Sequence, residues 1–536
     1  MRERVYLQTD KQTYLAGELL WMKLYLTDAE GKPSPLSKVG YVELLDAESV
    51  QVQVKLDISE GTGEGWLELP ITLPTGYYRL VAYSRYMQNE GDEVFFQKNI
   101  GVINTFLIDK TVEIDNSLTE PTFSVLDNTL SVIMANSRTK PRTENSIQIQ
   151  GLPEDVHSLA ISVAGKDLVQ DGSVLNISQW QDQLPATITT TTTAIRSDFL
   201  PEYEGHIINA KLINVATGQP ETTEKVSSLL GFVGEDIRLF DGVSDNQGNV
   251  QYVTKRITGR QELATATFPQ SENKFRVDIQ SPFAVHPKAD LPTFKLNSAW
   301  EQQLLQRSVG LQVLYSYMAD SLSIMERTTP HFQWKPYSSY ILDNYTRFTR
   351  MDEVVIEFVT LLSFRNIDRK RQLHLFIEKN VGRGAGSTLA LLDGIPITDH
   401  NILYNYDPLL VQRIELYRER FDFNGQFFDG LVSFTTYANN YPTLQLDEST
   451  QIFDYEGTQA RRLFYAPSYK NEAERNSRTP DYRHTLLWIP EVDTHGNSSV
   501  TIPFSTSDLT GEFQVVIEGL TKDGKPLRGI TYFDVE

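Results

Sequence analysis

Residues Leu389–Tyr437 read LALLDGIPITDHNILYNYDPLLVQRIELYRERFDFNGQFFDGLVSFTTY, and this stretch decides the predicted fold. Its first apolar run ends in Asp393-Gly394-Ile395-Pro396. We therefore predict a buried strand that stops at a tight turn, because Gly readily adopts positive φ and Pro cannot continue strand pairing. Residues 411–417 alternate apolar and polar side chains, as a half-buried strand does. A second Asp-Gly turn at 429–430 leads into the strand-like run 431–437.

The order of these elements resembles the plug domain of TonB-dependent outer-membrane receptors. A helix-like run at 351–364 with an acidic first turn, and a strand-like run at 373–377, precede the stretch where plug domains place such elements. The resemblance therefore extends over residues 349–445. A plug normally fills a barrel of its own chain, but residues 446–536 have the pattern of a sandwich. The resemblance thus implies a plug fold that stands alone or docks at an outer-membrane partner, possible partners being envelope proteins and a separate β-barrel.

The two turns of this region are the candidate interaction loops. We expect a rigid scaffold to present them to a partner, since binding residues are often carried by loops. The candidate residues are Asp393, Gly394, Ile395, Pro396, Arg418, Arg420, Phe427, Phe428 and Asp429. The alternative is that these turns only close the fold.

Residues 1–106 carry a second family pattern. The segment Val5–Glu18 reads VYLQTDKQTYLAGE, and Gly76–Tyr83 reads GYYRLVAY. Asp10-Lys11 is expected to form a polar turn, after which Tyr14 returns to the core. The pattern is similar to the second macroglobulin domain (MG2) of the alpha-2-macroglobulin superfamily. Macroglobulins trap proteases through a Cys-Gln thioester; the sequence contains no Cys, so the resemblance implies a scaffold without that reaction.

Three further regions are predicted to be β-sandwiches, because short β-like runs alternate with turn signals. Residues 107–197 form a second macroglobulin-like sandwich, with Ala186–Ala194 as an edge strand or linker. Residues 198–290 enter a Thr-Gly-Gln-Pro turn and resemble the carboxypeptidase-regulatory-like module. Residues 446–536 resemble an immunoglobulin-like or macroglobulin-like sandwich. The runs assigned to strands in 107–197 are 123–125, 130–134, 147–149 and 159–163.

Residues 291–348 are predicted to be a helical connector. Within 297–327 a helix is expected, with a seam formed by Leu304, Ser308, Leu311, Tyr315, Met318, Leu322 and Met325. Packing on its own domain and an intermolecular coiled coil are the two alternatives for this seam. The fold class is therefore mainly β: a multidomain chain of β-sandwiches with one helical segment and one α+β plug-like domain.

Composition excludes several classes of function. The 536 residues carry a net charge of -21 without a Lys/Arg-rich block, so nucleic acid is not an expected partner. No run of apolar residues is long enough for a transmembrane helix. Met1 is interpreted as a start that follows a removed signal or lipoprotein leader, with a native cytosolic start as the alternative. The expected location is the cell envelope, associated with the outer membrane on its periplasmic or outer face.

Catalytic motifs are absent from the sequence. The eight histidines are scattered without metal-ligand spacing, and no nucleophile elbow occurs. The loop Gly382–Ser387 lacks the Lys-Ser/Thr of a phosphate loop, and residues 245–249 lack the spaced carboxylates of a calcium loop. We therefore predict no catalytic residue, cofactor or metal, and a protein that binds other envelope proteins.

Three alternatives to this function remain open. The first is a plug that gates a separate barrel for transport. The second is a macroglobulin-like surface-binding or protease-interacting protein without a barrel partner. The third is an enzyme whose site lies between domains, which only a three-dimensional cluster of perturbed side chains would reveal.

Overall fold

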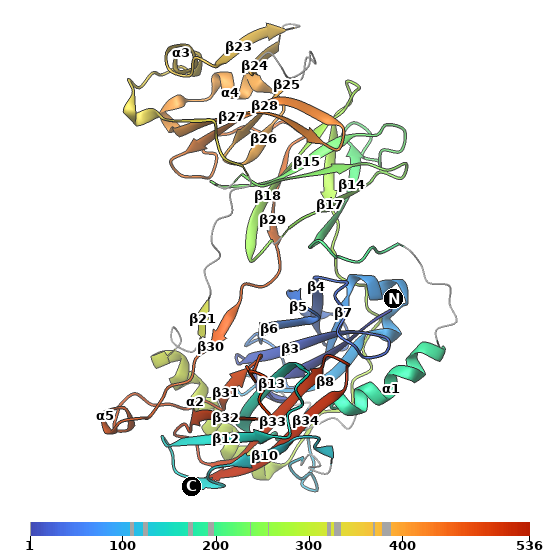
Figure 1. Cartoon of the computed structure of the whole chain (residues 1–536), viewed down its shortest axis with the longest axis vertical. Coiled ribbons are helices and arrows are strands. Elements are labelled where there is room, and N and C mark those ends of the chain that lie inside the picture. Colours follow the sequence, from blue (N-terminus) through green and yellow to red (C-terminus); the bar gives the residue numbers. More distant parts are fainter. Residues whose placement is uncertain are drawn as a thin grey trace. The chain divides into compact units, whose positions relative to one another are not determined.

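The computed structural model divides into two compact units, each with its own hydrophobic cores. Unit 1 comprises Met1–Tyr203, Phe283–Arg327 and Thr458–Glu536, and unit 2 comprises Glu204–Pro282 and Thr328–Gly457. Strands dominate both units, which confirms the mainly β fold class (Figure 1). The structure describes residues 2–107, 112–121, 127–169, 175–190, 198–235, 237–255, 257–318, 323–325, 334–367, 370–377 and 387–536, except for the side chains of 185–190, 318 and 323–324.

The MG2-like region of unit 1 is built from eight strands in the order β1-β3-β6-β5-β4-β7-β8-β2. Tyr14, Tyr25, Tyr41 and Tyr83 are fully buried in one core, as the sequence predicts for Tyr14. The strands are β1 (Glu3–Thr9), β2 (Thr13–Leu15), β3 (Leu19–Asp28), β4 (Val39–Leu45), β5 (Val50–Ser59), β6 (Thr62–Glu68), β7 (Gly76–Ser84) and β8 (Phe96–Ile103), and the 3₁₀ helices η1 (Arg85–Asn89) and η2 (Asp92–Val94) lie between β7 and β8.

The second sandwich of unit 1 takes its strands from two distant segments. One sheet has the order β10-β12-β32 and the other β11-β34-β33-β13-β31. The predicted regions 107–197 and 446–536 therefore share one sandwich instead of forming two, with Ile161 opposite Ile517 in the antiparallel β13–β33 pair. The strands are β10 (Ser131–Met134), β11 (Arg138–Thr139), β12 (Glu144–Gln150), β13 (Val156–Gly165), β31 (Thr485–Ile489), β32 (Ser499–Ser505), β33 (Gly511–Thr521) and β34 (Pro526–Val535).

Long-range pairing explains this difference. Strand β13 is buried along most of its length and has a hydrogen-bonded neighbour on each edge, and both neighbours come from the C-terminal segment. The alternation of side chains within a strand indicates its faces but not its neighbours. The predicted run 123–125 lies outside the described residues.

Helix α1 (Ile177–Thr190) corrects the prediction of an edge strand or linker over Ala186–Ala194, of which 191–194 lie outside the described residues. Ile177, Trp180 and Leu184 recur at helical spacing and are buried in the core of the MG2-like region. This apolar face stabilises the helix despite the β-branched threonines at its end, because tertiary packing overrides local propensity.

The predicted connector contains the 3₁₀ helix η4 (Ser298–Trp300) and helix α2 (Glu301–Met318). Ser308 and Leu311 of the predicted seam are buried against unit 1, whereas Tyr315 is partly exposed. The helix therefore packs on its own unit, through a face that also includes Arg307 and Leu314. The smaller elements of unit 1 are β9 (Glu113–Ile114), β20 (Lys295–Leu296), β21 (Ser323–Met325), β30 (Arg462–Phe464) and α5 (Glu472–Arg475).

In unit 2, the region that resembles the regulatory module is a sandwich of two sheets, β17-β14-β19 and β16-β15-β18-β29. Strand β29 comes from the segment predicted to begin the C-terminal sandwich, and it pairs with β18. The Asp245 carboxylate accepts hydrogen bonds from the amide N–H groups of Gln247 and Asn249, so it stabilises a turn in this loop. The strands are β14 (Ile207–Asn214), β15 (Ser227–Phe232), β16 (Leu239–Val243), β17 (Asn249–Val253), β18 (Arg260–Phe268), β19 (Phe275–Ile279) and β29 (Gln451–Glu456).

The α+β region of unit 2 has a five-stranded sheet of order β22-β27-β28-β25-β26, in which β25 and β28 are parallel. The helix expected over 351–364 ends at Glu357, and the residues after it form a hairpin of β23 and β24. The elements are β22 (Ser338–Ile341), η5 (Leu342–Asn344), α3 (Met351–Glu357), β23 (Leu362–Ile367), β24 (Lys370–Leu375), β25 (Ser387–Leu392), β26 (Ile395–Ile397), α4 (His400–Asn405), η6 (Pro408–Leu410), β27 (Val411–Phe423) and β28 (Gln426–Thr436).

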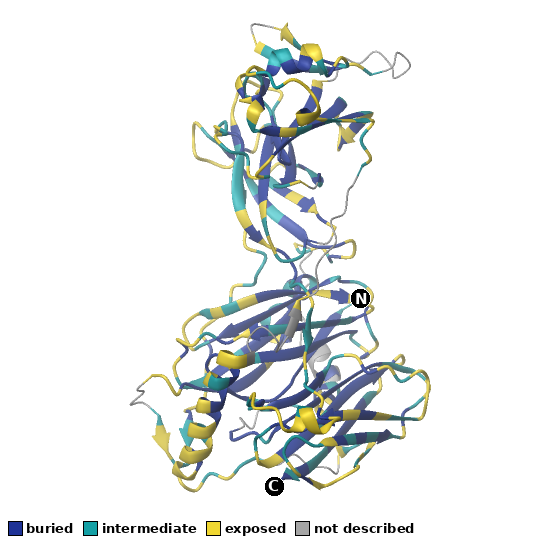
Figure 2. Cartoon of the chain, turned by 90° about the vertical axis from the view of Figure 1, so that its left-hand side faces the viewer, coloured by how far each residue is buried: buried dark blue, intermediate teal, exposed yellow. Residues whose placement is uncertain are grey.

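Buried residues run along the strands of each unit, and exposed ones gather at helix faces and turns (Figure 2). Among the described residues, no helix is both long and apolar enough to cross a membrane. The predicted loop at Gly382–Ser387 lies almost wholly outside the described residues.

Candidate functional site

The first candidate loop, Asp393–Pro396, is buried. Asp393 is 1% exposed, and its carboxylate accepts hydrogen bonds from the Thr436 amide (2.7 Å), the Thr436 hydroxyl (2.6 Å) and the Tyr441 amide (2.6 Å). Ile395 and Pro396 are buried as well. All these interactions lie within unit 2, so the carboxylate joins the β25–β26 turn to the end of β28.

Gly394 brings this turn against strand β15 of the adjoining sandwich. Its φ is +79°, and a Cβ built on it would lie 1.9 Å from the carbonyl oxygen of Phe232. The Gly234 amide donates to the Asp393 carbonyl at 2.8 Å. The four residues of this turn are buried within unit 2, a position that agrees with the alternative that the turn closes the fold.

The second group of candidates lies on the β27–β28 hairpin, where one face is buried and the other exposed. The predicted turn at Asp429-Gly430 is wrong: both residues lie inside β28, and the chain reverses at Asn424-Gly425. Phe428 is buried with Phe421 and Phe423 in a small core. Arg420 and Phe427 are exposed, and the Arg420 guanidinium lies over the Phe427 ring at 4.5 Å. The Arg420 side chain is also 3.9 Å from the Asp429 carboxylate.

Arg418 forms a second arginine–aromatic pair. Its guanidinium lies 4.5 Å from the centre of the Tyr337 ring and donates to the Phe376 carbonyl at 3.0 Å. Tyr337 and Phe376 are 63% and 51% exposed, and Phe427 is 42% exposed. We name this group the hairpin patch; it consists of Tyr337, Phe376, Arg418, Arg420 and Phe427. Exposed aromatic rings beside arginines are the side chains most enriched at protein–protein interfaces.

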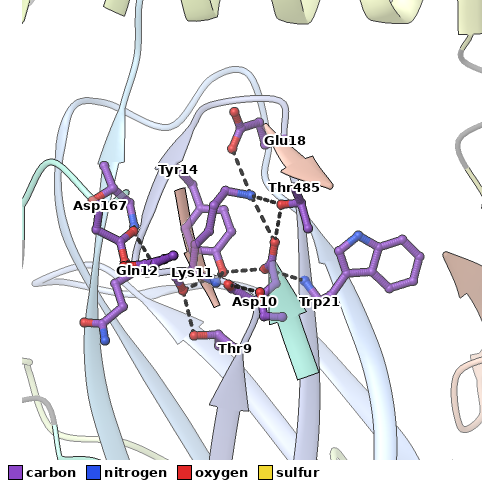
Figure 3. Close-up of polar contacts among 12 residues, drawn as sticks. Thr9, Asp10, Lys11, Gln12, Tyr14, Glu18, Trp21, Asp167 and Thr485 are labelled. Atoms are coloured by element: carbon purple, nitrogen blue, oxygen red, sulfur yellow. Dashed lines mark hydrogen bonds and ion pairs between the residues drawn. The ribbon is translucent and has the colours of Figure 1, made fainter. Parts of the chain in front are cut away.

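In unit 1, the predicted polar turn Asp10-Lys11 is buried under strand β31 (Figure 3). The Asp10 carboxylate accepts from the Tyr14 hydroxyl (2.7 Å), the Trp21 amide (3.1 Å) and the Thr485 hydroxyl (2.7 Å). Lys11 Nζ lies 3.1 Å from the same carboxylate. The turn thus connects the MG2-like region to the second sandwich of unit 1.

Glu18 extends this network to helix α2. Its carboxylate accepts two hydrogen bonds from the Arg307 guanidinium, at 3.0 and 2.8 Å, and lies 3.3 Å from Lys11 Nζ. Burial alone would raise the pKa of Glu18, but the charges of Arg307 and Lys11 outweigh it and lower the pKa to about 2. A carboxylate held ionised by two cations is suited to joining elements, not to accepting a proton near neutral pH.

In the rest of the described residues, clusters of side chains that could bind a metal or carry out catalysis are sparse. In the described part of the chain, no group of three or more His, Asp or Glu side chains could hold a metal ion. Sequence reasoning missed a polar cavity in unit 1 whose walls include Gln8, Lys98 and Gln514. These residues come from strands β1, β8 and β33, and no local pattern connects them.

Comparison with known proteins gave matches to solved structures alone: no family model and no curated protein matches the sequence. Salmonella alpha-2-macroglobulin reacted with methylamine is 10% identical, with a TM-score of 0.26, over 100% of this chain and 39% of that chain. The native Escherichia coli alpha-2-macroglobulin is 10% identical, with a TM-score of 0.25, over 100% and 40%. The Escherichia coli adhesin FdeC is 12% identical, with a TM-score of 0.14, over 50% and 60%.

The chain therefore spans about two fifths of the length of the macroglobulin structures it matches. At these TM-scores the likenesses carry no weight for function.

Proposed function

We propose that this chain is a non-enzymatic protein of the bacterial cell envelope that binds another envelope protein through the hairpin patch of unit 2. The observation that carries the proposal is the exposure of Tyr337 and Phe427, whose rings lie beside Arg418 and Arg420. Phe376, whose carbonyl accepts from Arg418, is exposed as well. The envelope location rests on the resemblance of the sequence to MG2 and plug domains.

The composition of the patch favours a protein partner with acidic groups. The whole chain carries a net charge of -21, yet the patch places two guanidinium groups over exposed rings. Arginine can bind a carboxylate through two parallel hydrogen bonds, and the rings supply apolar area around it. We infer a partner surface that combines carboxylates with apolar side chains, and the finer form of the proposal is docking at, or plugging, an outer-membrane protein.

The patch has a rigid support, which favours a preformed docking surface over a binding site on a mobile loop. Phe421, Phe423 and Phe428 anchor the opposite face of the hairpin in a buried core with Trp334 packed against it. Anchoring of this kind reduces the conformational entropy lost on binding.

The second candidate function is a macroglobulin-like surface-binding or protease-interacting protein. The buried network of Asp10, Glu18 and Arg307 supports this function only by holding unit 1 together, because each of these groups is bonded to other residues of unit 1. In that case the partner would contact unit 1, and changes to the hairpin patch would have no effect.

Affinity capture with matched variants tests the proposal. Tagged full-length protein would be cross-linked in envelopes, purified in detergent, and its partners quantified by mass spectrometry. Phe427→Ser together with Tyr337→Ser should reduce capture of a specific partner by about tenfold or more. The control is Leu409→Ser, since Leu409 is an apolar residue of unit 2 with a similar exposure, 44%, outside the patch.

Equal recovery of the same partners by the patch variant and the control would refute the role of the hairpin patch. Cross-links confined to unit 1 would move the function to the macroglobulin-like alternative.

A further inference from the structure

Unit 1 contains a polar cavity of about 220 Å³ beside the Asp10 network. Its walls come from strands β1 and β8, the turn after β1, Asp127, Asp167, the start of α1, and strands β33 and β34. A volume of this size would hold roughly seven waters, at about 30 Å³ each, or one small organic molecule.

Two buried side chains in the walls have polar atoms without partners. Gln8 and Gln514 are each 2% exposed, and Gln8 Nε2 and Gln514 Oε1 have no hydrogen-bond partner among the described residues. Gln12, which also lines the cavity, leaves its Oε1 unpartnered in the same way. Buried amide groups without partners cost free energy, so a ligand or water that pairs with them is stabilised.

Lys98 adds a cationic donor to the cavity. Its ammonium donates to the Thr9 hydroxyl at 2.6 Å, which engages one of its three N–H groups. Burial lowers the pKa of Lys98 to about 8, although the charges of Glu518, Asp167 and Asp10 oppose this. At neutral pH the side chain is still mainly charged and can bind a carboxylate.

The anionic side of the cavity is already held by protein donors. Glu518 accepts from the Tyr6 hydroxyl (2.7 Å) and the Ile177 amide (3.2 Å). Asp167 accepts from the Gln12 amide (2.8 Å) and from Gln514 Nε2 (2.8 Å). Gln514 therefore has a fixed orientation, with its carbonyl oxygen as the free acceptor beside the Asp167 carboxyl group.

We propose that this cavity is a binding site for a small zwitterion of amino-acid size, whose carboxylate pairs with Lys98 and Gln8 and whose ammonium group pairs with the carbonyl oxygens of Gln514 and Gln12. Free donors and free acceptors on the walls match the two ends of such a ligand. The site lies in unit 1 and does not depend on the hairpin patch of unit 2.

Thermal unfolding of the full chain with each of the standard L-amino acids at millimolar concentration tests this site. At least one amino acid should raise the midpoint of unit 1 unfolding in a saturable way, because a ligand that binds the folded state stabilises it. The N-acetylated, C-amidated form of that amino acid, which lacks both charges, should not. Isothermal titration calorimetry then gives the affinity.

Two variants of cavity residues and one control variant show whether binding occurs in this cavity. Gln8→Leu removes the unpartnered Nε2 donor and a long hydrogen bond (3.4 Å) from the Tyr25 hydroxyl, which keeps the Glu518 carbonyl as its acceptor at 2.9 Å. The variant should therefore change the stability of the ligand-free protein little, while it weakens binding of the amino acid about tenfold. Lys98→Met should abolish the preference for a free carboxylate. Gln148→Leu makes the same chemical change on strand β12, away from the cavity, and should leave binding unchanged.

The proposal is overturned if no amino acid shifts the midpoint, which would mean that the cavity holds only water. It is also overturned if the neutral derivative binds as tightly as the free amino acid, or if Gln8→Leu and Gln148→Leu have the same effect.

Discussion

At the scale of single residues, buried carboxylates in this protein are held by donors that lie far away in the sequence. Asp393 takes its donors from Thr436 and Tyr441, and Glu18 accepts both of its guanidinium hydrogen bonds from Arg307. The sequence predicts where each carboxylate lies in a turn or at the start of a strand. It does not predict that the carboxylate is buried, because the partners belong to other elements.

Replacement of Asp393 tests its structural role. Asp393→Ala leaves the two amide donors and the hydroxyl unpaired in a buried site, so the free energy of unfolding of unit 2 should fall by about 3 kcal/mol. Asp393→Asn keeps one acceptor oxygen and tolerates the positive φ of 47°, so it should cost less than the alanine variant. Urea unfolding measures both changes. An alanine variant as stable as the wild type would contradict the assignment.

The pH dependence of unit 1 tests the Glu18 pair. The pKa of Glu18 is lowered to about 2 in the folded state, so its stabilising effect is present above the unfolded value near 4.5 and disappears as the pH falls towards 2. The loss should be about 3 kcal/mol. Glu18→Gln should be less stable than the wild type at pH 7, and the gap in the free energy of unfolding should close on acidification. A gap independent of pH would exclude the lowered pKa.

At the scale of elements, the sequence predicts the strands well and their neighbours poorly. The period-two run at 411–417 is part of β27, and β25 ends at the Asp393-Gly394 turn, as expected. Pro396, however, lies opposite Leu391 in the edge strand β26, where the sequence predicted no further pairing. The predicted runs 130–134, 147–149 and 159–163 lie in β10, β12 and β13, but these strands share one sandwich with strands of 446–536. Helix α1 was missed because its buried face, with Trp180 at its centre, packs on a core formed by other strands.

The candidate site residues were also predicted only in part. Phe427 and Arg420 were identified from the turn and strand pattern and are exposed, whereas Asp393–Pro396 were identified by the same reasoning and are buried. A turn pattern indicates that the chain reverses but does not indicate whether another sheet covers the turn. Gln514 and Glu518, which line the cavity, lie on the same face of β33. Polar residues at such positions of a strand predict a face that is exposed to solvent.

A matched pair of glycine substitutions tests the packing of the β25–β26 turn on β15. Gly394 and Gly425 both have positive φ, +79° and +88°, so alanine should cost about 1 kcal/mol at either position through backbone strain. A Cβ at Gly394 would collide with the Phe232 carbonyl, whereas one at Gly425 meets no atom within 4 Å. Gly394→Ala should therefore destabilise unit 2 by at least 2 kcal/mol more than Gly425→Ala. Equal costs in thermal unfolding would contradict the close approach.

At the scale of the whole molecule, each unit has its own cores, and the chain passes from one unit to the other four times in sequence. Units with separate cores can unfold in separate transitions. Gly394→Ala should lower only the transition of unit 2, and Glu18→Gln only that of unit 1, as measured by calorimetry of the full chain. A single transition that both variants shift equally would contradict this independence.

If the hairpin patch contacts another envelope protein, that protein must lie close to Phe427 in the cell. The most direct measurement is photocross-linking from a benzophenone amino acid at position 427, with the same amino acid at position 409 as the control, in cells that make the full-length protein. We expect one dominant envelope protein to be cross-linked from position 427 and none from position 409. The cross-linked product should disappear when Arg418→Ala and Arg420→Ala are introduced. Equal cross-linking from both positions, or none from position 427 while cross-links form from unit 1, would contradict this expectation.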